Sequence, residues 1–324
     1  MLYKIKSAVK DIEIMVDTKS AQVNLRLSSS LKARAEKAAA QDHRSLTSLI
    51  EKLLADHLQG RASLQSWHGD AQSRFEELLL TRGGTSAAAL MPRSFHAFSF
   101  GISTTDGTEF KPQDLLQIVR SLPAGMRGVF NNPNLFHAYT RPELAPYFAA
   151  DAENNREILE SAVFPDVATL NETVEFWRIS PTGFASHIRT YNEDREELRQ
   201  QVRKDGGKWF WPYQMIRELH ELVIHAYLLA ERLKSTESVE FLCEWWGLRD
   251  REIADAEPGI HWTEGKIARE DHRVTRGEWA IDDLRRTPDI VSALAAPVLR
   301  LFDPSFDCSA EWAGEQTTRF KRLG

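Results

Sequence analysis

The sequence predicts an α+β protein with two domains, a small N-terminal module and a larger mixed domain. Two observations predict this class. Residues 21–58 hold one short alternating segment followed by two helical repeats, whereas residues 90–324 mix strand-like alternation with helical repeats. A polar, glycine-containing stretch separates them, so residues 59–89 are expected to form a linker that carries a short helix at Asp70–Leu80. The 324 residues suffice for two domains of ordinary size.

The composition is typical of a soluble globular protein, with 42% hydrophobic and 27% charged residues. No apolar run approaches the ~20 residues that a membrane-spanning helix needs, and the N-terminus lacks the apolar region of a signal peptide. We therefore expect a cytoplasmic protein without a membrane partner. The two cysteines, Cys243 and Cys308, stand far apart and form no CxxC motif. Neither a disulfide framework nor a metal site is expected.

The charge is distributed unevenly along the chain. Residues 1–60 hold ten basic and seven acidic side chains, a net charge of +3, so the remaining chain carries −9 for the total of −6. A basic head on an acidic body is compatible with nucleic-acid binding through the head alone. Residues 1–20 are expected to be a flexible arm, with Lys10 and Lys19 near the nucleic acid, unless the native chain starts at Met15.

The segment Gln22–Leu27 alternates polar and apolar side chains, as a half-buried strand does. Its apolar face holds Val23, Leu25 and Leu27, and its polar face holds Gln22, Asn24 and Arg26. Serines at 28–30 supply N-cap candidates for a first helix at about Ser29–Gln41. Ser45 supplies the cap of a second helix, which carries a strong apolar stripe.

A short strand without a partner in the sequence predicts a dimer. Its unpaired backbone groups and the exposed stripe of the second helix are costly in a monomer. Pairing with the same strand of a second chain satisfies both, and four helices then cover an apolar core made by Val23, Leu25, Leu27, Leu49, Ile50 and Leu53. The polar face of the two-stranded ribbon fits the major groove of DNA, where Asn and Gln bond adenine and Arg bonds guanine.

From Gln22 to Arg26, and again at Arg44-Ser45, the module resembles the Arc repressor type of ribbon-helix-helix protein. The resemblance implies a homodimer on double-stranded DNA, in which Gln22, Asn24 and Arg26 read bases and Ser45, Leu46 and Thr47 contact phosphates. Proteins of this type can bury an Arg-Glu-Arg triad. Here Arg44 stands at the first position, but Leu49 and Leu53 stand at the others. Arg44 is therefore left to bind a phosphate or to face solvent.

The larger domain shows several clear elements. We expect strands at Phe95–Ile102 and Val239–Trp245, a hairpin of Thr173–Ser180 and Phe184–Tyr191 around Pro181-Thr182-Gly183, and helices at 214–233 and Asp289–Phe302, the latter with a kink at Pro297.

No catalytic residue is expected in this domain. His220 and His225 share a helix, but five steps of ~100° turn their side chains ~140° apart, so they cannot share a metal ion. Ser186 and His187 lie on the hairpin without the glycine pattern of a nucleophile turn.

Two further clusters allow more than one interpretation. The charged stretch Glu264–Arg273 favours a solvated loop over an acid–base or metal role. The aromatic runs Trp209–Trp211 and Trp245-Trp246 favour core or interface packing over stacking on bases or on a planar ligand.

A second resemblance covers the larger domain. Tyr139–Tyr147, together with Phe176–Pro181, looks like the C-terminal region of bacterial proteins with a Schlafen/AlbA-like nucleic-acid-binding domain. It implies a sensing or oligomerising body that is attached to different heads. We expect a homodimeric transcriptional regulator that is not an enzyme and needs no cofactor, with an effector or protein partner at residues 90–324. The alternatives are a DNA-anchored component of a plasmid-maintenance, toxin–antitoxin or phage-defence system and, last, a nucleotide-processing enzyme.

Overall fold

The chain divides into two compact units, Met1–Gln59 and Gly60–Gly324, in a computed structural model. The structure describes residues 29–41, 45–50, 63–82, 94–104, 108–126, 135–140, 144–151, 156–164, 174–194, 208–235, 237–254 and 265–323. Within these ranges, no helix is both long enough and apolar enough to cross a membrane.

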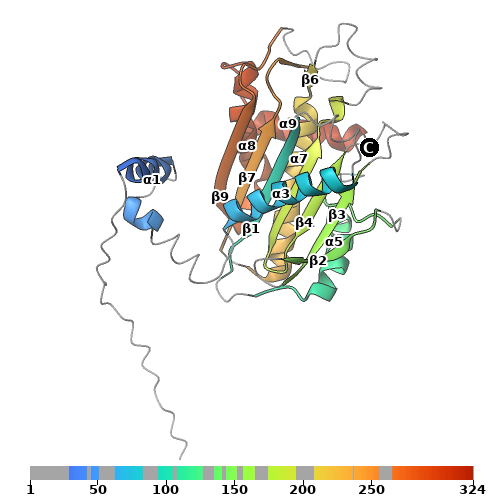
Figure 1. Ribbon diagram of the computed structural model, residues 1–324. Coiled ribbons are helices and arrows are strands. Elements are labelled where there is room, and N and C mark those ends of the chain that lie inside the picture. Colours follow the sequence, from blue (N-terminus) through green and yellow to red (C-terminus); the bar gives the residue numbers. More distant parts are fainter. Residues whose placement is uncertain are drawn as a thin grey trace, which may run out of the picture. The chain divides into compact units, whose positions relative to one another are not determined.

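An antiparallel sheet forms the centre of the larger unit (Figure 1). Among the described residues it has seven strands in the order β2-β3-β4-β5-β1-β7-β9. The strands are β1 (Phe95–Ile102), β2 (Tyr147–Asp151), β3 (Arg156–Val163), β4 (Glu175–Ile179), β5 (Phe184–Thr190), β7 (Ser238–Trp246) and β9 (His272–Ala280). A separate parallel pair joins β6 (Lys208–Phe210) to β8 (Arg251–Ile253). The mixed α+β class expected for this unit is confirmed.

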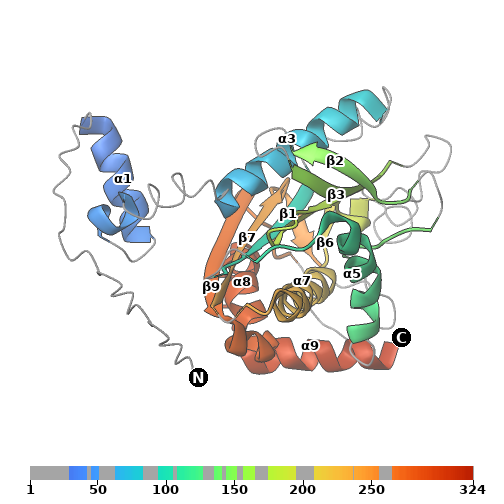
Figure 2. The same ribbon diagram turned by 90° about the horizontal axis from the view of Figure 1, so that it is seen from below.

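Helices cover both faces of the sheet (Figure 2). The helices of the larger unit are α3 (Leu64–Arg82), α5 (Pro112–Gly125), α7 (Pro212–Leu233), α8 (Thr287–Phe302) and α9 (Ala310–Leu323), with 3-10 turns at η1 (Asn192–Asp194) and η2 (Ile281–Arg285). Among the described helices, α3 is the one on one face, and α7 is the central helix of the layer on the other face. In the smaller unit, α1 (Ser29–Gln41) and residues 46–50 are helical.

The central strand β1 is buried on both faces. Phe98, Phe100 and Ile102 point into the main core beneath α7, as the alternation of the sequence predicts. The opposite face carries Ala97, Ser99 and Gly101. These residues are small because α3 and the Phe184 ring approach this face closely; a Cβ on Gly101 would lie 2.6 Å from that ring.

Three further predicted elements of the larger unit are confirmed. The hairpin of β4 and β5, the long helix α7 and the strand β7 occupy the expected positions. Helix α7 starts at Pro212 and ends at Leu233, and the next residue, Lys234, closes it with a left-handed φ of 54°. Helix α8 covers the expected final helix and keeps Pro297 inside it.

Helix α3 differs from the prediction of a short helix in a linker. It begins six residues earlier than Asp70, because Ser63 caps it: Ser63 Oγ accepts a hydrogen bond from the Ser66 N–H at 3.1 Å. Gly69 interrupts the helical pattern in the sequence and hides this start. Ala71, Phe75 and Leu78 pack on the sheet, so α3 belongs to the body.

Other elements were not predicted. They are the edge strands β2 and β9, the strand β3 and the helices α5 and α9. The expected solvated loop Glu264–Arg273 is correct for residues 265–271 and wrong at its end, where β9 begins at His272.

The hairpin turn gives a prediction about stability. Gly183 has a φ of 90°, and a Cβ there would also meet Leu233 at 2.8 Å. We expect Gly183→Ala to lower the free energy of unfolding by roughly 1–2 kcal/mol or more. A side chain is unfavourable in this left-handed backbone conformation, and its Cβ would also be too close to Leu233. Gly69 lies in a helix with nothing within 4 Å of its Cβ position. Gly69→Ala should therefore raise stability by roughly 0.5–1 kcal/mol.

Denaturant unfolding followed by tryptophan fluorescence measures both variants, since all nine tryptophans lie after residue 60. Equal destabilisation by the two alanines would contradict these assignments.

Candidate functional site

Most of the residues predicted to contact DNA lie outside the described residues. They are Gln22, Asn24 and Arg26 of the base-reading face and the phosphate-binding Arg44. The residues Val23, Leu25, Leu27 and Leu53, predicted for the dimer core, also lie outside the described residues. Ser45, Leu46, Thr47, Leu49 and Ile50 are described.

The first helix of the module forms at the expected position. Helix α1 buries Ala39, which is 2% exposed, and half-buries Ala35. Its outer face carries an exposed i,i+4 ion pair between Lys32 and Glu36 at 3.7 Å. Among the described side chains, the helix is therefore amphipathic, with Ala35 and Ala39 on its buried side.

Ser45 caps the second helix as expected. Its Oγ accepts the Ser48 N–H at 3.1 Å, and its carbonyl accepts the Leu49 N–H at 3.0 Å. Ser45 and Thr47 are exposed, whereas Leu49 and Ile50 are half-buried. A capped helix end with exposed hydroxyl residues and a positive dipole is suited to an anion such as a phosphate.

The two histidines of α7 are buried groups with separate partners. His220 Nε2 lies 3.3 Å from the carbonyl of Ala313, and His225 Nδ1 lies 2.8 Å from the carbonyl of Glu221. Burial lowers the pKa of each ring to about 4. No group of three His, Cys, Asp or Glu side chains in the described ranges could hold a metal ion.

The tryptophan runs mostly pack inside the body. The Phe210 ring stacks on the Phe302 ring, with the ring centroids 4.8 Å apart. Trp245 is fully buried, and its ring meets the Phe98 ring edge-on, with the centroids 5.2 Å apart. Trp246 stacks on His272 at 3.6 Å. Trp211 is half-buried and lines a crevice beside α7, together with Trp245.

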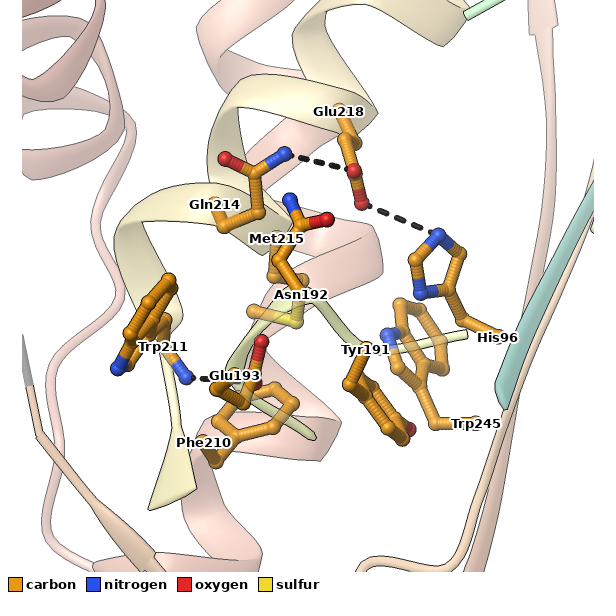
Figure 3. A pocket seen from close by; sticks show the side chains of 10 residues that line it. All are labelled: His96, Tyr191, Asn192, Glu193, Phe210, Trp211, Gln214, Met215, Glu218 and Trp245. Carbon is orange, nitrogen blue, oxygen red and sulfur yellow. Dashed lines mark hydrogen bonds and ion pairs between the residues drawn. The ribbon is translucent and has the colours of Figure 1, made fainter. Parts of the chain in front are cut away.

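This crevice brings together polar side chains that the sequence separates widely (Figure 3). It is lined by His96, Tyr191, Asn192, Glu193, Phe210, Trp211, Gln214, Met215, Glu218 and Trp245. The cavity within it measures about 10 Å³, which is room for one water molecule. Its geometry therefore suits a bound water better than a substrate.

Glu218 is the central charge of the crevice and is 1% exposed. Its carboxylate accepts hydrogen bonds from Arg189 Nη1 at 3.1 Å and from Gln214 Nε2 at 2.7 Å. The same carboxylate lies 3.1 Å from His96 Nε2. His96 of β1 lies directly opposite Arg189 of β5, so both side chains point to the same face of the sheet, toward α7. Burial lowers the pKa of His96 to about 4 although Glu218 raises it, so a neutral imidazole adjoins a carboxylate that Arg189 neutralises.

Glu193 lies at the edge of the crevice, on the turn η1. Its Oε1 accepts the backbone N–H of Trp211 at 3.0 Å, at the start of α7. Burial raises the pKa of this carboxyl to about 7; nearby Arg251 lowers it and Asp194 raises it further. Arg251 is itself buried, bonds Asp194 and lies over the Tyr191 ring at 4.2 Å.

A second polar cluster joins α3 to the sheet. The His68 Nδ1 atom lies 2.7 Å from Ser99 Oγ, which lies 2.6 Å from Ser186 Oγ. On the other side of the ring, Gln72 Nε2 lies 3.2 Å from His68 Nε2 and donates to Glu244 at 2.7 Å.

A hydroxyl, an imidazole and a carboxylate in sequence are the parts of a nucleophilic triad. However, Ser99 is 0% and His68 is 1% exposed, so an acyl substrate does not reach them. The cluster instead holds α3 on the sheet. No spacing rule connects Ser186 to His68, so the cluster was not predicted from the sequence.

The crevice predicts a specific dependence of stability on pH. A carboxyl with a folded pKa of about 7, against an ordinary value of 4.5, binds more protons when folded, so its contribution to stability falls as pH rises from 4.5 through 7. Glu193→Gln keeps an oxygen for the Trp211 N–H but does not titrate. The variant should gain stability relative to wild type between pH 5 and 8, by on the order of 2–3 kcal/mol.

Denaturant unfolding at several pH values measures this difference. The exposed Glu76→Gln on α3 serves as the control. A Glu193→Gln difference that stays constant across this pH range would show that Glu193 is charged throughout.

Two places in the described chain therefore have a defined chemistry. The Ser45-capped helix end suits an anion, and the crevice surrounds one buried carboxylate with a guanidinium, an amide and an imidazole. Comparisons of this chain with protein-family models, with curated proteins and with solved structures found no match.

Proposed function

We propose that this protein is a dimeric transcriptional regulator that binds specific DNA sequences through an N-terminal ribbon-helix-helix module. The observation that carries the proposal is the Ser45-capped helix end, which follows an alternating strand sequence with Gln22, Asn24 and Arg26 on its polar face. In this mechanism two chains pair their strands, and the ribbon enters the major groove.

The capped helix end supplies the second contact. Its free backbone N–H groups and positive dipole bind a phosphate beside the groove, with Ser45 and Thr47 exposed toward it. Phosphate contacts of this kind orient the ribbon, whereas contacts to base edges provide the specificity. The half-buried Leu49 and Ile50 suit the dimer core, since each keeps apolar surface for a partner.

The proposal also draws on the division of the chain. The basic head and the acidic body form separate compact units, so DNA binding needs only the head. The body has its own core and a buried polar crevice, which support a regulatory role rather than a reaction.

Arg26→Ala should relax the base preference at one position of each half-site. A bidentate Arg–guanine contact contributes about 1–3 kcal/mol of discrimination, so the preference there falls roughly tenfold to a hundredfold. Selection of binding sites from a random DNA library with the full chain, wild type and variant, measures the change. An unchanged motif, or an equal loss of affinity for all sequences, would contradict base reading by Arg26.

Substitution of Ser45 separates its structural role from its contact with DNA. Ser45→Asp retains an N-cap residue, so the module should stay folded, but it adds a negative charge beside the phosphate. We expect weaker binding to all sequences by the same factor, most strongly at low salt. Ser45→Asn is the uncharged control with the same capping ability. Equal affinities of the two variants would argue against a phosphate at this helix end.

A further inference from the structure

A chain of polar side chains connects helix α3 to three strands of the sheet. It starts at Glu244 of β7, passes through Gln72 and His68 of α3, and continues to Ser99 of β1 and Ser186 of β5. The four successive contacts measure 2.7, 3.2, 2.7 and 2.6 Å. His68, Ser99 and Ser186 are at most 1% exposed, so the side chains themselves fix the direction of each hydrogen bond.

The carboxylate at the start of the chain fixes the orientation of the Gln72 amide. Burial raises the pKa of Glu244, but contacts with His68 and Gln72 lower it to about 2, so the group is ionised and only accepts. The atom of Gln72 that lies 2.7 Å from it must therefore be the nitrogen. The same nitrogen lies 3.2 Å from His68 Nε2 and can only donate, so Nε2 accepts.

The orientation of Gln72 in turn fixes the protonation state of His68. An imidazole that accepts at Nε2 is neutral and carries its proton on Nδ1. The Nδ1–H group donates to Ser99 Oγ, and the Ser99 hydroxyl then donates to Ser186 Oγ. Every contact of the chain has a donor and an acceptor in this arrangement.

A second proton on His68 would reverse one contact and leave the others unchanged. Nε2 would become a donor that faces the donor of Gln72 at 3.2 Å. However, Glu244 Oε2 lies only 3.6 Å from the same Nε2 atom, so an imidazolium bonds it directly once Gln72 turns away. The bond from Nδ1–H to Ser99 persists in both forms.

We propose that His68 is a pH-sensitive switch, which exchanges the Gln72 bridge for a direct ion pair with Glu244 when the medium is acidified. A buried imidazolium without a partner is costly, and Glu244 provides the partner. Helix α3 therefore stays on the sheet in both forms, and the change lies in which of its side chains binds β7. The switch acts at the first helix of the unit Gly60–Gly324 and does not depend on DNA binding.

Among the described residues, one other titratable group lies beside this carboxylate. His272 Nε2 of β9 is 3.8 Å from Glu244 Oε2, and its ring stacks on Trp246. The His272 side chain is 33% exposed, so solvent reaches it. Trp246 Nε1 donates to Glu244 at 3.1 Å, and the strands β1 and β5 present uncharged hydroxyls to the His68 ring. His272 is therefore the histidine that must be distinguished from His68.

NMR of the full-length chain with ¹⁵N-labelled histidine rings tests the switch. Ring nitrogens with and without a proton differ in chemical shift, and single-histidine variants assign the signals. At about pH 8 we expect His68 to carry a proton on Nδ1 alone, and at about pH 5 on both nitrogens. A proton on Nε2 alone at the higher pH, or a ring that stays neutral at the lower pH, would overturn the proposal.

Two substitutions should move the His68 transition in opposite directions. Gln72→Met keeps the length of the side chain but removes the donor to the neutral ring, so the transition should move to higher pH by about one unit, a tenfold change in proton affinity. Glu244→Gln removes the partner of the charged ring, so the transition should move to lower pH. An unchanged transition in Gln72→Met, or shifts of both variants in the same direction, would contradict the exchange of partners.

His272→Gln is the matched control, because it removes the other histidine beside Glu244. His68 should still become doubly protonated in this variant. Loss of the His68 transition there would show that His272 governs the response, and the switch would then not lie on α3.

Discussion

The contact between His68 and Ser99 is the interaction on which the body's architecture depends. One helix, α3, covers the face of β1 that lies opposite the main core, and it does so over small side chains. Apolar packing around Phe75 supplies contact area, but it does not by itself fix where the helix lies. The ring and the hydroxyl meet at 2.7 Å, and moving the helix away would leave the buried Nδ1 atom of His68 without this partner, at a cost in free energy. The polar contact thus determines the position, and the apolar contacts on either side stabilise it.

The same reasoning explains which parts of the fold were predictable. Strand β1 and helix α7 follow from period-2 and 3.6-residue repeats, because the environment of each is uniform along its length. Helix α3 was misjudged because Gly69 breaks its pattern, and β9 because its charges suggested a loop. The polar sites were hidden for another reason: Gln72 and Glu244 are 172 residues apart, and only the strand order brings them together. The alternation of β1 placed His96 on the core face, yet nothing in the sequence assigned Glu218 to it.

In the proposed function, the difference in charge assigns DNA binding to the N-terminal unit and keeps the larger unit from competing for DNA. DNA attracts any basic surface, so a regulator needs a body that does not compete with its reading head. The net −9 of the chain after residue 60 meets this requirement, and acids neutralise several basic side chains of the body, as Glu270 does Arg273 and Glu218 does Arg189. Specificity under this proposal therefore resides in the ribbon.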